Sequence, residues 1–211
     1  MLDNNGFDVW AKEYEKTVQK DSNGYPFKGY YDVLDLMYGL IEQRPKNQIL
    51  DIGVGTGILT NRLYEDGAQI CGIDFSKKML QIAQNKMPEG KFIQWDFNLG
   101  LPPEFGPEKF NYIISSYAFH HLSNSKKISL IDESKALLDK TGKIIIGDVA
   151  FETEEGLLKC KKESKSKWDE DEIYIIADEM AQAIKKHGLA VNYTQVSSCA
   201  GVLEIHQLHE A

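Results

Sequence analysis

The sequence predicts an α/β fold organised around a mostly parallel β-sheet. Short apolar runs alternate with amphipathic segments from Ile49 to Val149, a pattern typical of strands and helices that alternate along a chain. Runs at 189–196 and 201–208 are separated by only a few small residues and predict an antiparallel hairpin. The chain has 211 residues, 42% of them hydrophobic, and is long enough to bury one sizeable core. We therefore expect a single domain with a seven-stranded sheet.

Each element is predicted from its own local pattern. The five parallel strands are expected at 48–52, 68–74, 91–96, 110–116 and 143–149. Helices are expected at 59–66, 77–87, 126–138 and 172–186, and one more begins at Glu154. Gly67 and Pro88 end the first two helices, and Ser76 can cap the second. Each of the first three helices is long enough to cross over the sheet between two parallel strands.

Aromatic residues are concentrated ahead of the sheet. Trp10, Tyr14 and Val18 follow helical spacing, and a second helix is expected from about 30 to 41. The segment contains more aromatic residues than an ordinary pair of surface helices exposes. We therefore expect these residues to cover something other than solvent.

Composition excludes several classes of function. A formal net charge of −8 would repel a polyanion, so we expect no nucleic-acid partner. No window approaches the roughly 18 consecutive apolar residues of a membrane span, and the start of the chain does not look like a secretion signal. We expect a cytoplasmic protein without a membrane partner. The three cysteines are far apart and predict neither a disulfide framework nor a zinc site.

Three glycines follow the first strand closely. Gly53, Gly55 and Gly57 lie between this strand and a helix, where a tight turn lets backbone approach a ligand without a Cβ in the way. Asp51 precedes them, and Asp74 ends the second strand 21 positions after Gly53. In an open parallel sheet, such groups meet at the carboxyl ends of the strands, and an acid there can bind ribose hydroxyls. A simple tight turn would also use these glycines.

The order of four motifs adds a family resemblance. The stretches are LDIGVGTG (50–57), GIDFS (72–76), QWDF (94–97) and YIISSYAFHHL (112–122). They resemble the successive motifs of class I S-adenosylmethionine (SAM) dependent methyltransferases, across about residues 7 to 208. Within that superfamily the chain is similar to the small YrrT-like methyltransferases of bacteria, through DVWAKEY and SSYAFHHL. The resemblance implies a Rossmann-like fold, N-terminal lid helices, SAM as methyl donor and S-adenosylhomocysteine (SAH) as product.

The resemblance also implies roles for residues in the cofactor site. Gly53, Gly55 and Gly57 would line the methionine and ribose part, Asp51 would hold the ammonium group directly or through water, and Asp74 would bind the ribose hydroxyls. The remaining cofactor contacts would be Phe75, Met79, Asp96 and Phe97 around the adenine, Ser115 beside the methyl group, and Tyr14 near the methionine carboxylate. Each has a structural alternative: Asp96 can cap a strand end, and Phe75 or Met79 can be plain core.

The acceptor end is expected between the lid and the loop after the fourth strand. Residues 1–45 would form the lid and 46–211 the cofactor-binding core. Trp10, Tyr30, Tyr117 and His120 would line the substrate pocket. His120 and Tyr117 are the candidate catalytic residues, since a histidine there titrates near neutral pH and can act as a base. The alternative is a histidine hydrogen-bonded within its loop. No metal site is expected, because the pair His120 and His121 has no third ligand placed by spacing.

Two other functions compete with methyl transfer. A dehydrogenase that uses a nicotinamide cofactor would share the fold, but its third glycine is usual at position 58, where this chain has Ile58. A protein that binds SAM without catalysis would keep every cofactor motif. Methyl transfer to a small molecule fits best, because no extra recognition domain or basic face is present, whereas a protein or RNA acceptor is a weaker alternative. Neither the acceptor nor the oligomeric state can be predicted from these patterns.

Overall fold

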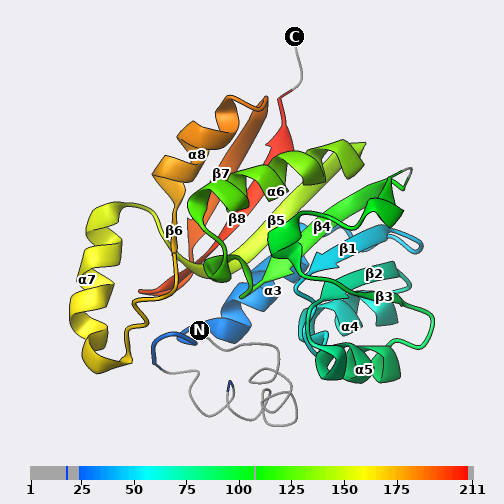
Figure 1. The fold of residues 1–211 in the computed structure, drawn as a ribbon, viewed down its shortest axis with the longest axis horizontal. Coiled ribbons are helices and arrows are strands. Elements are labelled where there is room, and N and C mark those ends of the chain that lie inside the picture. The colour runs from blue at the N-terminus through cyan, green and yellow to red at the C-terminus, as the bar shows by residue number, and fades with distance from the viewer. Residues whose placement is uncertain (1–17, 19–23, 107, 209–211) are drawn as a thin grey trace.

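The fold is a mixed β-sheet covered by helices on both faces. The structure, a computed structural model, describes residues 18, 24–106 and 108–208. Seven strands follow one another in the order β3-β2-β1-β4-β5-β8-β7, and a short strand β6 pairs with β5 (Figure 1). Their bounds are β1 Gln48–Ile52, β2 Gln69–Asp74, β3 Lys91–Gln94, β4 Phe110–Ser116, β5 Leu138–Phe151, β6 Ile175–Ile176, β7 Leu189–Gln195 and β8 Ala200–Gln207.

Strand directions confirm the predicted class of fold. The pairs from β3 through β5 are parallel, whereas β8 is antiparallel to both β5 and β7. The C-terminal hairpin was therefore predicted correctly. After β1 the chain proceeds outward through β2 and β3 and then returns to add β4 on the other side of β1. This reversal places a crevice at the carboxyl ends of β1 and β4, where sheets of this kind bind ligands.

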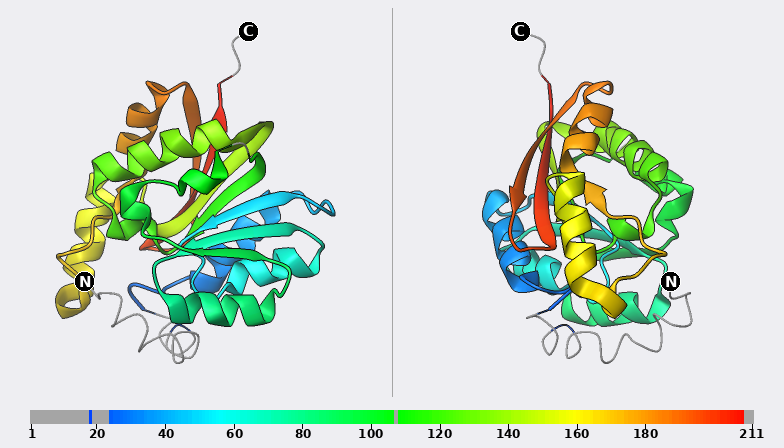
Figure 2. Two further views of the ribbon diagram at one scale, coloured as in Figure 1. Left: turned by 45° about the vertical axis from the view of Figure 1, so that its right-hand side comes forward. Right: turned by 90° about the vertical axis from the view of Figure 1, so that its left-hand side faces the viewer.

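The helices form two layers on opposite faces of the sheet. Their bounds are α3 Tyr30–Leu40, α4 Ile58–Glu65, α5 Lys77–Lys86, α6 Asn124–Leu137, α7 Glu154–Ser164 and α8 Ala177–Lys185. Buried residues of α3 and α4 belong to one apolar cluster, and those of α6 and α8 belong to the other. Figure 2 shows α3 and α6 on opposite sides of the sheet. Gly147 lets α3 lie close to β5, since a Cβ there would overlap Val33 and Met37.

Most helix boundaries agree with their expected caps. Ser76 accepts a hydrogen bond from the Met79 N–H at the start of α5, as its position predicted. The expected helix at 30–41 is α3, and the helix expected from Glu154 is α7. No helix among the described residues is both long and apolar enough to cross a bilayer. The three cysteines are free and buried.

The helix expected at 172–186 is wrong in its first part. Ile175 and Ile176 form β6, which pairs in parallel with the end of β5, and the helix begins only at Ala177. The physical reason is that β-branched residues favour extended backbone, and the end of β5 offers a free edge. This error matters for the site, because Glu172 lies on an irregular segment and not on a helix.

Two strand boundaries also differ from the prediction. Strand β3 ends at Gln94, and Asp96 follows as the cap of a short 3-10 helix at Phe97–Leu99. Strand β5 begins directly after α6, at Leu138, and is longer than the expected 143–149. The pairing of β5 with β4 is irregular between Phe110 and Tyr112, where the added residues of β5 are accommodated.

Candidate functional site

The turn between β1 and α4 is built from glycines with positive φ. Gly53 has φ 74° and Gly55 has φ 53°, values that other residues rarely adopt. The N–H groups of Gly53 and Val54 donate to the Ile73 carbonyl oxygen at 2.8 and 3.0 Å, which binds the turn to β2. A Cβ at Gly53 would lie 2.5 Å from Ala118 Cβ, whereas one at Gly55 would meet no atom within 4 Å. Gly55 therefore borders open space.

Asp74 joins this turn to the loop after β2. One carboxylate oxygen accepts a hydrogen bond from the Gly55 N–H at 2.9 Å, and the other accepts one from the Ser76 N–H at 2.8 Å. The side chain is mostly buried but still borders the cavity described below. A carboxylate thus stands beside the bare backbone of the turn, as the sequence predicted for this pair of loops.

A cavity of about 510 Å³ lies at the carboxyl ends of β1, β2 and β4. Six of the predicted cofactor residues line it: Gly53, Gly55, Asp74, Phe75, Met79 and Phe97. Three of the predicted acceptor residues also line it: Tyr30, Tyr117 and His120. The fold therefore brings residues from four separate motifs to one cavity of the size that small-molecule sites usually have.

Four predicted cofactor residues lie behind or beside this cavity instead of lining it. Gly57 caps the start of α4 with φ 73°. Ser115 is buried and donates to the Ile52 carbonyl oxygen at 2.6 Å, so it joins β4 to β1. Asp96 is exposed, and its Oδ1 accepts from the backbone and side chain of Asn98 at the start of the 3-10 helix Phe97–Leu99. Asp51, the fourth, lies in β1 just before the glycine turn. Tyr14 and Trp10 lie outside the described residues.

Asp51 is a buried carboxylate with one satisfied oxygen. Its Oδ2 accepts a hydrogen bond from the Thr60 hydroxyl, and its Oδ1 has no hydrogen-bond partner within the described part of the chain. Burial raises the pKa of Asp51 to about 7, although the Thr60 hydrogen bond opposes that shift and the charge of Asp74 adds to it. An unsatisfied buried acceptor directly behind the glycine turn is suited to a cationic ligand group or an ordered water.

We expect Asp51 to make stability depend on pH. The folded protein holds the Asp51 proton up to pH about 7, whereas an unfolded aspartate loses it near pH 4. Between these values the folded state binds more protons, so rising pH destabilises it. The free energy of unfolding of wild type, relative to Asp51→Asn, should fall from pH 4 to 7 and level off above. Urea unfolding of both proteins across this range checks it, and parallel curves would contradict it.

Aromatic residues close the cavity on the side of α3. The rings of Tyr30 and Tyr117 stack with centroids 4.6 Å apart, and Phe27 lies 6.3 Å from Tyr117. Pro26 and Phe27 line the cavity from the segment before α3. Tyr117 itself has φ 52°, which is strained for a residue with a large side chain. Strain of this kind is concentrated at functional sites, and here it follows directly after β4.

His120 lies in the 3-10 helix Phe119–His121 and is held by a buried carboxylate. Its Nδ1 is 2.6 Å from Asp148 Oδ1, and its backbone N–H donates to Asp148 Oδ2 at 3.1 Å. Burial lowers the pKa of His120, but the charge and hydrogen bond of Asp148 together with the charge of Glu172 raise it overall. Burial raises the pKa of Asp148, but His120, the Val149 N–H and His121 together lower it overall. The other ring nitrogen, Nε2, lies 3.6 Å from Glu172 Oε1.

Three acids near His120 were not predicted as site residues. Asp169 and Glu172 line the cavity, and Asp148 Oδ1 lies 2.6 Å from His120 Nδ1. Asp148 could have been found, because it lies near the carboxyl end of a parallel strand, as Asp51 and Asp74 do. Asp169 and Glu172 carry no such signal, since their segment reads as an acidic surface run. Only its path across the end of the sheet brings it to the cavity.

Comparison with known proteins identifies the family of the chain. A family described as "Methyltransferase domain" matches residues 49–142. An uncharacterized methyltransferase of Alkaliphilus oremlandii is 35% identical over 176 residues, which is 82% of this chain and 78% of the relative. The uncharacterized methyltransferase YrrT of Halobacillus halophilus is 31% identical, with 94% of both chains covered.

Solved structures share the fold at low sequence identity. A DhpI–SAH complex has a TM-score of 0.73 and 13% identity, covering 97% of this chain and 94% of the other. Magnesium protoporphyrin IX methyltransferase (ChlM) from Synechocystis PCC 6803 with bound SAH has a TM-score of 0.71 and 18% identity, covering 96% and 99%. Together with the curated relatives, these likenesses bear out the predicted class of fold. The chain therefore belongs to the methyltransferase family that includes the uncharacterized methyltransferase YrrT.

Proposed function

We propose that this protein transfers a methyl group from SAM to a small-molecule acceptor. The observation that carries the proposal is the meeting of the Gly53–Gly55 turn with the Asp74 carboxylate in one cavity. Bare backbone and a carboxylate side by side are what recognition of a ribose and its substituents requires. The SAM and SAH complexes of proteins that share the fold add support.

The residues around the cavity fit this cofactor. A side chain at Gly55 would project into the open space, and Asp51 Oδ1, which has no hydrogen-bond partner among the described residues, lies behind the same turn. Asp74 would hold the ribose hydroxyls, and Phe75 and Met79 would pack on the adenine. Asp51 would hold the ammonium group, through an ordered water if not directly. Asn98 donates only to Oδ1 of Asp96, so Oδ2 is the oxygen that would accept from the adenine amine.

The chemistry asks little of the protein besides alignment. When bound, SAM supplies a methyl group on a positively charged sulfur, which accepts the bonding electrons as the methyl leaves. Tyr30, Tyr117 and Phe27 exclude water from the acceptor side and restrict the direction of approach. The base role of His120 stays a prediction, because Asp148 holds Nδ1 and Glu172 faces Nε2.

The acceptor we propose is small because of the space that is available. A cavity of about 510 Å³ has to hold both the cofactor and the reacting part of the acceptor. Its acceptor end is enclosed by α3 and by the segment that carries Asp169 and Glu172. The acids at this end would repel a phosphate backbone, which disfavours an RNA acceptor.

Ligand-dependent melting tests the proposed cofactor. SAM or SAH at 100 times the dissociation constant should stabilise the folded protein by about 2.7 kcal/mol, because only the folded state binds. NAD at the same concentrations should leave the melting temperature unchanged. Differential scanning fluorimetry with the three ligands measures this. Stabilisation by NAD alone would reject the proposal in favour of a dehydrogenase.

A further inference from the structure

His120, His121 and Glu172 form a cluster at the acceptor end of the cavity. One ligand atom of each residue, a ring nitrogen or a carboxylate oxygen, lies within 4.8 Å of the other two. All three residues line the cavity. Spacing along the sequence could not supply a third ligand for the histidine pair, but the fold supplies Glu172 from the segment that precedes β6.

The distance between two of these ligands fits a single metal ion. His120 Nε2 and Glu172 Oε1 are 3.6 Å apart, too far for a hydrogen bond. Two ligands at about 2.1 Å from a tetrahedral Zn²⁺ lie about 3.4 Å from each other. The pair is therefore spaced as two ligands of one ion would be. His121 is next to His120, with ring centroids 4.1 Å apart.

Further hydrogen bonds orient two of the three side chains, those of His120 and Glu172. Asp148 holds Nδ1 of His120, which leaves the lone pair of Nε2 for the cavity side. Tyr174 donates to Glu172 Oε2 at 2.8 Å, so Oε1 is the oxygen that remains toward His120. Histidines that bind a metal commonly donate their other ring N–H to a carboxylate, and carboxylates that bind a metal are commonly hydrogen-bonded in turn.

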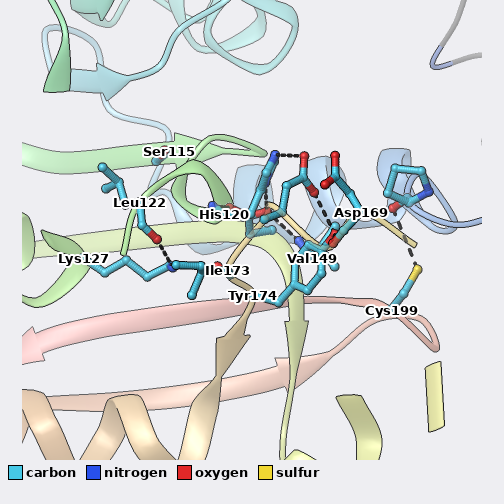
Figure 3. A network of polar contacts seen from close by, with 12 residues as sticks. Ser115, His120, Leu122, Lys127, Val149, Asp169, Ile173, Tyr174 and Cys199 are labelled. Carbon is cyan, nitrogen blue, oxygen red and sulfur yellow. Dashed lines mark hydrogen bonds and ion pairs between the residues drawn. The ribbon is translucent and has the colours of Figure 1, made fainter. Parts of the chain in front are cut away.

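The backbone fixes the two segments against each other. The Ile173 N–H donates to the His120 carbonyl oxygen at 2.9 Å. Lys127 Nζ donates to the carbonyl oxygens of Leu122 and Ile173, at 2.5 and 2.6 Å, and so joins the same segments a second time (Figure 3). The backbone that carries His120 and the backbone next to Glu172 are therefore fixed against each other by the fold. Such preorganisation is what a binding site needs.

Charge at the cluster favours a cation. Glu172 and Asp169 line the cavity here, and Asp148 lies directly behind His120. Lys127 interacts electrostatically with Asp148 and offsets part of the negative charge of these three carboxylates. Two imidazoles and one carboxylate are the ligand set of catalytic zinc sites that keep a fourth position open. Mg²⁺ prefers oxygen ligands and fits this set poorly.

We propose that His120, His121 and Glu172 bind one Zn²⁺ ion at the acceptor end of the cavity, with a fourth coordination position open to the acceptor. Binding of the ion does not depend on the proposed function, but a role of the ion in activating the methyl acceptor rests on it. A thiol or hydroxyl of the acceptor that binds at the open position would release its proton to solvent and keep the electron pair, since a bound metal ion lowers its pKa. The acceptor class is then a small thiol or alcohol.

Metal titration tests the site directly. The full chain is stripped with EDTA, and Zn²⁺ is titrated in competition with a chromophoric indicator at fixed pH. We expect one equivalent of Zn²⁺ to bind, and Mg²⁺ at the same concentrations to leave the signal unchanged. Co²⁺ in place of Zn²⁺ should give the visible absorption of a tetrahedral site. A stripped protein that binds no Zn²⁺ would overturn the proposal.

Substitutions locate the bound ion. Glu172→Gln and His121→Gln should each weaken Zn²⁺ binding at least tenfold, because each removes one of three ligands. The matched control is His187→Gln, since His187 Nδ1 lies 3.0 Å from Asp132 Oδ1 in another histidine–carboxylate pair, at the surface. That variant should bind Zn²⁺ as wild type does. Equal affinity in all four proteins would place the ion elsewhere and reject the cluster.

The same experiments distinguish a metal site from a simple ion pair in this cluster. A protonated His120 could form a simple ion pair with Glu172 across the same 3.6 Å, and in that case the stripped protein would bind no Zn²⁺. The melting shift of wild type with SAH is measured independently and tests only the cofactor site. Loss of metal binding with a normal SAH shift would reject the metal site alone, and the reverse result would reject the proposed function alone.

Discussion

Replacing Asp74 by Ala is expected to weaken SAH binding about 100-fold. The carboxylate borders the cavity and already accepts the Gly55 N–H at 2.9 Å. Two hydrogen bonds from ribose hydroxyls to a charged group contribute about 1.5 kcal/mol each at the low end of their range, and 1.4 kcal/mol corresponds to a tenfold change in affinity. Isothermal titration calorimetry with SAH measures the loss.

The matched control for this variant is Asp66→Ala. Asp66 is an exposed aspartate at the C-terminal cap of α4, and its carboxylate accepts a hydrogen bond from the Tyr38 hydroxyl at 2.7 Å. The Asp66→Ala substitution removes an equal charge at a position outside the cavity, so SAH affinity should stay within about threefold of wild type. Unchanged affinity in Asp74→Ala, in a variant that still melts cooperatively, would contradict the assignment of Asp74 to the ribose.

Replacing Lys127 by Met is expected to lower the free energy of unfolding by about 3 kcal/mol. The ammonium group is buried and donates to two backbone carbonyl oxygens, of Leu122 and Ile173. Met has a similar length but no donor, and each buried acceptor left without a partner costs about 1–3 kcal/mol. Removal of a buried cation recovers part of this, since burial lowers the pKa of Lys127 to about 8. Urea unfolding at pH 7 measures the difference.

Lys135→Met is the control on the same helix. Its Nζ donates to the His187 carbonyl oxygen at 2.5 Å, but the side chain is only partly buried. Water can replace the lost donor, so this change should cost less than about 1 kcal/mol. Equal losses in the two variants would show that burial of the Lys127 contacts has no special weight. A larger loss for Lys127→Met would support its role as the link between α6 and the Glu172 segment.

Lys127 also illustrates what local patterns miss. Its helix, expected at 126–138, was placed correctly, since α6 spans Asn124–Leu137. A lysine in the first turn of a helix would ordinarily be assigned to the solvated face. In the folded protein it is fully buried, because the segment before β6 crosses over it and supplies a carbonyl oxygen. No sequence pattern within the helix predicts that this segment crosses over Lys127.

Some features of the site could be predicted from local sequence patterns, and others could not. The glycine turn and Asp74 could be predicted, because both lie where a strand ends and the sheet brings such ends together. The resemblance assigns Asp96 and Ser115 to the cofactor, but it could not predict that Asp96 accepts from Asn98 or that Ser115 donates to the Ile52 carbonyl oxygen. Residue type and position near a strand end do not reveal the direction in which a side chain points. That direction depends on the register and on the neighbouring loops.

Local periodicity and turn chemistry, both carried by neighbouring residues, were enough to determine the order along the chain of α3 to α8 and of every described strand except β6. They also determined the C-terminal hairpin and the glycine turn beside Asp74. Only the tertiary structure decided that Asp148, Glu172 and Lys127 surround His120, because these residues come from segments far apart along the chain. Contacts of that kind depend on how β5 ends and how the following segment returns across the sheet. The methyltransferase core could therefore be predicted from the sequence, whereas the arrangement of charged groups at the acceptor end of the cavity could not.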